Sequence, residues 1–327
     1  MLYDNHGRHI NYLRLAVTDR CNLRCFYCMP EHGIDYIDRS ELLTYEEMER
    51  LLLIFADLGI DKLRITGGEP FVRKGMMEFL EKIAHSVPLR EINITTNGTF
   101  TTNYVERIKK AGIGSVNLSL DSLNAGRFYR ITRRDMFDEV MDTFHKMLRY
   151  DLRVKINMVV MEGKNTEDIY PMIELTKQHP VSVRFIEEMP FNGTEGQGNT
   201  TFWPERKILD HIKKEYTSVE KIADPAHSTS KNYRISGYAG TFGTIAAYTR
   251  TFCGSCNRIR LTPQGTLRTC LYGEGKVNFR DLMRSGASDR EIGDQLKNTL
   301  QKRAIDGFQA EEQRRKSVSE SMATIGG

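Results

Sequence analysis

The sequence has no long apolar run and no segment typical of an export signal. No stretch of its 327 residues approaches the roughly 20 apolar residues of a membrane helix. The N-terminus also lacks the apolar core of a signal peptide. We therefore expect a cytoplasmic protein with no membrane partner. The formal net charge is only +4, so a nucleic-acid partner, which needs a concentrated basic face, is not expected either.

A solenoid repeat and a phosphate-binding loop are missing too. The chain shows no self-similar period, and the motif G-x4-G-K-[ST] does not occur in it. Any nucleotide would therefore have to be bound by side chains or a cofactor, because a glycine-rich backbone cradle of that kind is absent.

Down to about residue 188, short β-rich runs alternate with segments of helical periodicity. Six such units predict βαβ connections and a parallel sheet. Two apolar stripes support the predicted helices: Met48, Leu51, Leu52 and Phe55 in one, and Phe137, Val140, Met141, Phe144, Met147 and Leu148 in the other.

The predicted strands alternate apolar and polar residues, whereas parallel strands are normally apolar on both faces. Leu13 and Leu15 flank Arg14, for example, and the other strands repeat this pattern. Because successive strand residues point to opposite faces, each strand would have one apolar face and one polar, often cationic face. A doubly wound sheet would bury these charges at high cost, and an antiparallel sheet with a solvated face fits the intervening helices poorly. We therefore predict an α/β fold, an incomplete (β/α)6 TIM-type barrel with a polar lumen.

The character of the chain changes after Glu188, which suggests three parts. We expect a partial barrel over residues 1–190 and a C-terminal α+β extension over 191–307 that closes it. Few large apolar residues follow, so 308–327 is predicted to be a flexible tail that ends in Gly326-Gly327.

Six cysteines form two sets of three. Cys21, Cys25 and Cys28 have the spacing C-x3-C-x2-C in the loop after the first predicted strand. The second set has the spacing C-x2-C-x13-C and consists of Cys253, Cys256 and Cys270. In a reducing compartment such clusters indicate metal or cluster ligands in place of a disulfide framework.

Three kinds of site would explain the clustering of the cysteines. A structural zinc ion needs four ligands, and His32 is the histidine nearest to the first set, so zinc stays open only for the second. A thioredoxin-like pair of Cys25 and Cys28 would leave Cys21 without a role. A cubane cluster normally has four thiolates, so three would leave one iron open to a small molecule. Two iron–sulfur clusters are therefore favoured.

The cysteine motif CNLRCFYC matches the signature of the radical S-adenosylmethionine (SAM) superfamily, and TGGEP, residues 66–70, resembles its second motif. Within that superfamily the chain resembles the GTP 3′,8-cyclase family of molybdenum cofactor biosynthesis. The segments that carry this resemblance are LRLAVTDRCNLRCFYCMP, LRITGGEP, TTNG and FCGSCNRIRLTPQGTLRTCL.

The resemblance implies two [4Fe–4S] clusters, SAM as cofactor and GTP as substrate. The implied activity is a lyase reaction, the conversion of GTP to (8S)-3′,8-cyclo-7,8-dihydroguanosine 5′-triphosphate, which is the first step of molybdopterin formation. Further implied partners are a reductant such as flavodoxin or ferredoxin and a downstream cyclic pyranopterin monophosphate synthase. A homodimer is left open.

The resemblance also implies roles for individual residues. The cluster ligands would be Cys21, Cys25, Cys28, Cys253, Cys256 and Cys270, the first three of them catalytic together with Arg258 and Arg260. SAM would be bound by Tyr27, Gly67, Gly68, Glu69, Ser119 and Met189. GTP would be bound by Arg14, Arg64, Thr95, Lys155, Arg258, Ile259 and Arg260, with Arg268 a weaker candidate.

Plainer interpretations remain for several of these residues. Tyr27 and Met189 could be packing residues, TGGEP could be only a strand-end turn, and Arg258 and Arg260 could lie on a solvated strand face. Two other functions stay open as well: a peptide-modifying radical SAM enzyme with an auxiliary cluster, and a non-catalytic iron–sulfur electron-transfer protein.

Overall fold

The computed structural model describes residues 1–189, 202–314 and 321–325. Parallel strands alternate with helices in the N-terminal part and lie side by side in chain order. The elements of this part are β1 (Tyr12–Ala16), α1 (Tyr45–Asp57), β2 (Lys62–Thr66), α2 (Met76–Ser86), β3 (Glu91–Thr96), α3 (Val105–Lys110), β4 (Ser115–Ser119), α4 (Ala125–Thr132), α5 (Phe137–Arg149), β5 (Val154–Val160), α6 (Ile169–Gln178) and β6 (Ser182–Glu187).

The C-terminal part extends this sheet at both ends. Strand β10 pairs in parallel with β1, and β9 pairs in parallel with β6. The elements of this part are α7 (Glu205–Glu215), β7 (Val219–Lys221), β8 (Ser230–Ile235), β9 (Thr241–Ile245), β10 (Arg258–Leu261), β11 (Thr266–Arg268), β12 (Val277–Asn278), α8 (Phe279–Arg284), α9 (Asp289–Leu300), α10 (Gly307–Glu312) and α11 (Met322–Ile325).

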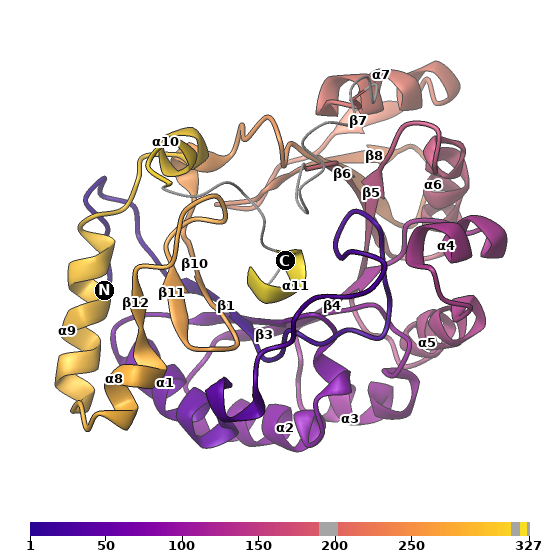
Figure 1. The fold of residues 1–327 in the computed structure, drawn as a ribbon. Coiled ribbons are helices and arrows are strands. Elements are labelled where there is room, and N and C mark those ends of the chain that lie inside the picture. The colour runs from indigo at the N-terminus through magenta and orange to yellow at the C-terminus, as the bar shows by residue number, and fades with distance from the viewer. Residues whose placement is uncertain (190–201, 315–320, 326–327) are drawn as a thin grey trace.

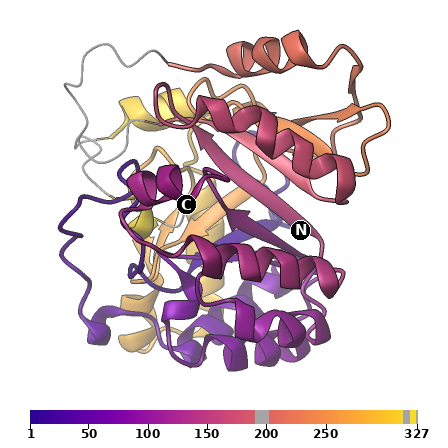
Figure 2. The same ribbon diagram turned by 90° about the vertical axis from the view of Figure 1, so that its right-hand side faces the viewer.

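The strands curve around a common interior, with helices outside (Figure 1). Among the described residues the order is β12-β11-β10-β1-β2-β3-β4-β5-β6-β9-β8-β7, and β12 and β7 are not paired with each other. The predicted incomplete (β/α)6 barrel with an α+β extension is therefore confirmed. Helix α7 lies on the opposite side of the molecule from α1, α2 and α3 (Figure 2).

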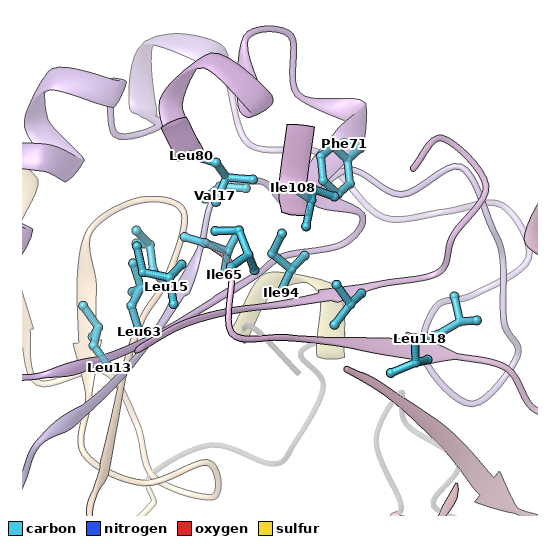
Figure 3. Packing of buried hydrophobic residues seen from close by; sticks show 14 of the residues in the cluster. Leu13, Leu15, Val17, Leu63, Ile65, Phe71, Leu80, Ile94, Ile108 and Leu118 are labelled. Carbon is cyan, nitrogen blue, oxygen red and sulfur yellow. The ribbon is translucent and has the colours of Figure 1, made fainter. Parts of the chain in front are cut away.

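The apolar strand faces point outward to the helices. The side chains of Leu15, Ile65 and Ile94 are fully buried and point towards the helices that carry Leu80 and Ile108 (Figure 3). The predicted stripe on α1 is confirmed, because its members, such as Phe55, are all buried. A capping box between Thr44 and Glu47 begins this helix.

The extension is attached to the barrel through α1. The ring of Phe55 meets that of Phe279 at the start of α8, with a centroid separation of 5.3 Å. On the surface, Arg50 forms an ion pair of 2.7 Å with Asp289 at the start of α9. Glu47 of α1 also forms an ion pair of 2.7 Å with Arg284 of α8, so one buried ring contact and two surface ion pairs join the two parts here.

The segment predicted as a flexible tail is in part helical. It contains most of α10 and all of α11, and α11 lies within the curve of the strands (Figure 1). Ala323 and Ile325 are buried there, Ile325 in a cluster with Tyr272 and Ala310. These contacts are supplied by the rest of the fold, so composition alone does not reveal them. Gly326-Gly327 and the predicted boundary near residue 190 lie outside the described residues.

Within the part of the chain that the structure describes, none of the helices has both the length and the apolar character needed to cross a membrane.

The contact between α1 and α8 gives a first prediction. Phe55→Ala should lower the free energy of unfolding by about 3–5 kcal/mol, because it leaves a cavity where a fully buried ring meets Phe279. Leu53→Ala on the exposed side of the same helix is the matched control, with a change within about 0.5 kcal/mol. Urea unfolding followed by circular dichroism measures both. Equal effects of the two substitutions would contradict the packing described here.

Candidate functional site

A row of arginines crosses the inner face of the sheet. Arg14 on β1 is in register with Arg64 on β2 and with Arg260 on β10, and Arg260 is in register with Arg268 on β11. Neighbouring strands lie about 4.8 Å apart, so four arginines of like charge occupy adjacent positions on one face. Such neighbours destabilise a sheet unless something compensates their charge.

Burial and mutual repulsion disfavour the positive charges of this interior. The pKa values of Arg14 and Arg184 are each lowered to about 10, chiefly by desolvation on burial and also by the neighbouring Arg64. The pKa of Lys155 is lowered to about 8, first by burial and then by Arg184 and Arg64. Burial also lowers the pKa of Arg260 well below its usual value. A bound anion would relieve all of these penalties together.

Buried polar atoms on the same face have no hydrogen-bond partner among the described residues. They include Nε of Arg14 and Arg184, Nδ2 of Asn93, and Oδ1 of Asn117 and Asn157. Buried polar groups in proteins are nearly always paired. This set offers both donors and acceptors, which fits a ligand that is anionic at one end and carries a polar ring or sugar at the other.

Two of the predicted GTP-binding residues already contact each other. Arg64 donates from Nε to Tyr12 Oη at 2.6 Å and from Nη1 to Thr95 Oγ1 at 3.3 Å. Although burial opposes it, Arg64 and Arg14 lower the pKa of Tyr12 to about 8. The phenol therefore acts as a partial counter-charge inside the cationic row.

The first cysteine set lies in the loop after β1 and is held there by the TGGEP segment. Gly68 N donates to Thr18 O and Glu69 N donates to Arg20 O, both at 2.8 Å. A Cβ added at Gly67 would lie 2.6 Å from Thr18 O, and one at Gly68 would lie 2.3 Å from Arg20 O. The two glycines are thus required for close approach to the cysteine loop itself.

Glu69 is fully buried next to this loop. Its carboxylate accepts hydrogen bonds from Phe71 N at 3.1 Å, Thr96 Oγ1 at 2.8 Å and Asn97 N at 2.7 Å. Burial raises its pKa to about 7. These bonds fix the carboxylate in place, and its predicted contact with the SAM ammonium remains a prediction.

The first cysteine set fits a cubane cluster. Burial raises the pKa of each of its three thiols, and repulsion between the thiolates contributes at Cys25 and Cys28, so these sulfurs are near one another. All six cysteines are free. Among the described residues no three His, Cys, Asp or Glu side chains are grouped as ligands of a single ion. The ligands of a cubane each bind a different iron, so they do not need that convergence.

The other predicted SAM-binding residues come from different parts of the chain, and their contact with SAM remains a prediction. Tyr27 donates from its hydroxyl to Asp121 Oδ2 at 2.7 Å. Ser119 is the last residue of β4, in register with Asn157. Met189 accepts a hydrogen bond from Tyr272 Oη at 3.2 Å and packs against the cluster that contains Ile325.

The second cysteine set borders the arginine row. Cys256 lies two residues before the start of β10, and both Cys256 and Cys270 interact electrostatically with Arg260. Burial opposes a low pKa at Cys256, yet Arg258 and Arg303 lower it below the usual value. Arg258 donates to His227 O at 2.6 Å. The cationic row therefore connects with the second set.

The side chain of Ile259 lies on the other face of β10. It is fully buried in the hydrophobic core, between the inward-facing Arg258 and Arg260. A contact of this residue with substrate would therefore use its main chain.

The structure adds residues to the site that the sequence analysis did not select. Arg184, Asn117 and Asn157 share the inner face with Lys155, as the strand register shows. The same alternation that marks Arg14 could have identified them. Arg303, which lies at the second cysteine set, follows α9 and has no such signal.

Family models match both parts of the chain. The model of the Radical SAM superfamily matches residues 15–176, and that of Molybdenum Cofactor Synthesis C matches residues 181–308. A crystal structure of Streptococcus suis SuiB bound to S-adenosylmethionine has a TM-score of 0.61 at 16% identity, covering 88% of this chain and 68% of that one. At this identity the likeness shows the fold alone.

Relatives match over most of the chain. GTP 3′,8-cyclase of Syntrophomonas wolfei subsp. wolfei is 41% identical, covering 89% of this chain and 90% of the relative. Molybdenum cofactor biosynthesis protein 1 of Dictyostelium discoideum is 39% identical, covering 89% of this chain and 47% of the relative. The chain thus spans about half the length of that second relative. The chain has a partial barrel, two cysteine sets and this similarity to known cyclases. It therefore belongs to the GTP 3′,8-cyclase family of the radical SAM superfamily.

Proposed function

We propose that this protein converts GTP to (8S)-3′,8-cyclo-7,8-dihydroguanosine 5′-triphosphate, the first step of molybdenum cofactor biosynthesis. The observation that carries the proposal is the row of four arginines on the inner face, which borders the second cysteine set. A polyphosphate supplies the negative charge that this row lacks, and guanidinium groups are well suited to bind it. The family membership supports the same substrate.

Each cysteine set would hold a [4Fe–4S] cluster, the first through Cys21, Cys25 and Cys28, the second through Cys253, Cys256 and Cys270. When bound, the first cluster and SAM supply the one-electron chemistry that starts ring closure. The chain itself positions the loop through Gly67 and Gly68.

The remaining work of the chain is to bind and orient GTP. Arg14, Arg64 and Arg260 would bind the triphosphate, and Lys155 would add a charge that responds to pH. The unpaired amide oxygens of Asn117 and Asn157 could accept hydrogen bonds from the ribose or the base. The curved sheet with its outer helices would exclude water from the reacting atoms (Figure 1).

Some parts of the proposal concern the setting of the enzyme. The protein would work in the cytoplasm with a reductant such as flavodoxin or ferredoxin, and a cyclic pyranopterin monophosphate synthase would consume its product. A homodimer is compatible with these roles. We also propose the division at residues 190 and 307 into barrel, extension and C-terminal segment.

The central test is 5′-deoxyadenosine formation by the anaerobically reconstituted protein with SAM and a strong reductant. GTP should stimulate this formation strongly, and deuterium at C3′ of GTP should appear in the 5′-deoxyadenosine. Cys25→Ala, which lacks one ligand of the first cluster, should form none. Slow formation that is indifferent to GTP would overturn the substrate assignment and favour a peptide substrate. No formation despite two intact clusters would favour electron transfer.

The arginine row predicts how a single substitution affects binding. Arg14→Ala should weaken GTP binding by about 10- to 100-fold, because a charge-assisted hydrogen bond contributes about 1.5–3 kcal/mol. Equilibrium binding of GTP and iron content are measured together. Arg153→Ala is the control, since Arg153 is exposed and its side chain donates to Gly114 O at 2.7 Å, away from the inner face. Loss of iron with unchanged GTP affinity in Arg14→Ala would count against a role in substrate binding.

The lowered pKa of Lys155 predicts a pH dependence of binding. Above about pH 8 the free protein loses this proton, so GTP binding must restore it, and affinity should fall by up to tenfold for each pH unit. Tyr12, with a pKa of about 8, acts in the same direction. Lys155→Arg keeps its charge at every pH used and should flatten the dependence between pH 8 and 9.5. Tyr12→Phe, measured in parallel, gives the part of the slope that Tyr12 contributes. An unchanged slope in Lys155→Arg would show that Lys155 does not contact the substrate.

A further inference from the structure

One guanidinium group contacts a sulfur of the second cysteine set. Arg303 Nη2 lies 3.2 Å from Cys256 Sγ and donates to Arg258 O at 3.0 Å. Its side chain is almost completely buried. The guanidinium thus bonds both to a cluster ligand and to the strand that carries the substrate arginines.

The N-terminal segment holds Arg303 in this orientation. Asp4 Oδ2 lies 3.3 Å from Arg303 Nη1 and 2.7 Å from Arg8 Nε. The other carboxylate oxygen of Asp4 accepts from the backbone N–H groups of His6 and Arg8, at 3.0 Å each. His6 Nε2 is also 2.9 Å from Arg303 O. The buried carboxylate is therefore fully engaged, and the guanidinium has little freedom to turn away from the sulfur.

The same segment fixes the surrounding backbone. Arg8 donates from Nη1 to Cys253 O at 3.3 Å and from Nη2 to Ala304 O at 2.9 Å. The group of Asp4, Arg8 and Arg303 contains two positive charges and one negative charge. A net positive charge thus remains beside Cys256, with Arg258 close by.

The first cysteine set has different surroundings. The charged groups that act on its thiols are mostly carboxylates, Glu69 at Cys21 and Asp121 at Cys25 and Cys28, with the cation Arg24 also acting on Cys21. In the described part of the chain, it is at the second set that a charged side chain donates a hydrogen bond to a cysteine sulfur. The neutral amide of Asn97 lies 3.7 Å from Cys21 Sγ at the first.

Hydrogen bonds to ligand sulfurs and nearby positive charge raise the reduction potential of an iron–sulfur cluster. We propose that Arg303 is a positioning residue that donates a charge-assisted hydrogen bond to Cys256 Sγ and thereby raises the reduction potential of the second cluster. The proposal rests on the proposed function in one respect, that Cys253, Cys256 and Cys270 hold a cluster.

The test is a redox titration of the full-length reconstituted protein, followed by electron paramagnetic resonance without GTP. The signal that changes on addition of SAM belongs to the first cluster, and the other signal reports the second. In Arg303→Met, at a fixed potential, the ratio of reduced to oxidised second cluster should fall by about tenfold, which is 59 mV for one electron. Arg303→Lys keeps the charge but loses the planar fork, so its shift should be smaller in the same direction. The first cluster should not shift.

The matched control is Arg50→Met. Arg50 attaches the start of α9 through Asp289 and Ala287 O, whereas Arg303 follows the end of the same helix. Loosening that helix without touching Cys256 should leave both potentials unchanged.

Iron content separates the outcomes. A wild-type protein that binds only one cluster would refute the proposed function, whatever the effect of Arg303. An unchanged second potential in Arg303→Met, with full iron content, would overturn the inference alone. So would loss of the second cluster in both Arg303 variants, because Arg303 would then be a structural clamp. An equal shift in Arg50→Met would also overturn it.

Discussion

Mutual repulsion among buried cations is the constraint around which this molecule is organised. Arg268, Arg260, Arg14 and Arg64 stand on four adjacent strands, and the sheet holds them together although their charges oppose it. The outer face of the same strands offsets this cost, because residues such as Leu13 and Ile65 are fully buried against helices. Apolar burial on the outer face thus stabilises the sheet, whereas the cations on the inner face destabilise it. A local cost of this kind is common at functional sites.

The two cysteine sets depend on the same strands in different ways. The first occupies a loop whose path is set by Gly67 and Gly68, since neither position has room for a Cβ. The second lies around β10 and β11, with Cys256 two residues before β10 and Cys270 two residues after β11, so the pairing that places Arg260 beside Arg14 also bears on where Cys256 lies. The position of one cluster is thus determined by local backbone packing, and that of the other by pairing between distant strands.

Strand alternation made much of the fold and part of the site predictable. It identified the inward side chains of Arg14, Arg64 and Lys155, and with the intervening helices it favoured the partial barrel. Arg184 obeys the same rule, but no motif surrounds it that would mark it as a site residue. Contacts between distant parts of the chain left no local trace: the bond of Asp4 to Arg303 and the burial of Ile325 against Tyr272 depend on the completed fold. The prediction of a flexible tail overlooked α11 for this reason.

The pairing of β1 with β10 also bears on how the chain folds. Tyr12 lies opposite Arg258, so one edge of the first strand has no partner until nearly the whole chain has left the ribosome. Loop closure over such a separation is slow, and an unpaired strand edge invites association with other chains. The charge of Arg14 on this strand would reduce such association before β10 is made, because charged side chains discourage edge-to-edge pairing. A residue proposed to bind substrate in the finished protein would thereby also protect the nascent chain from association.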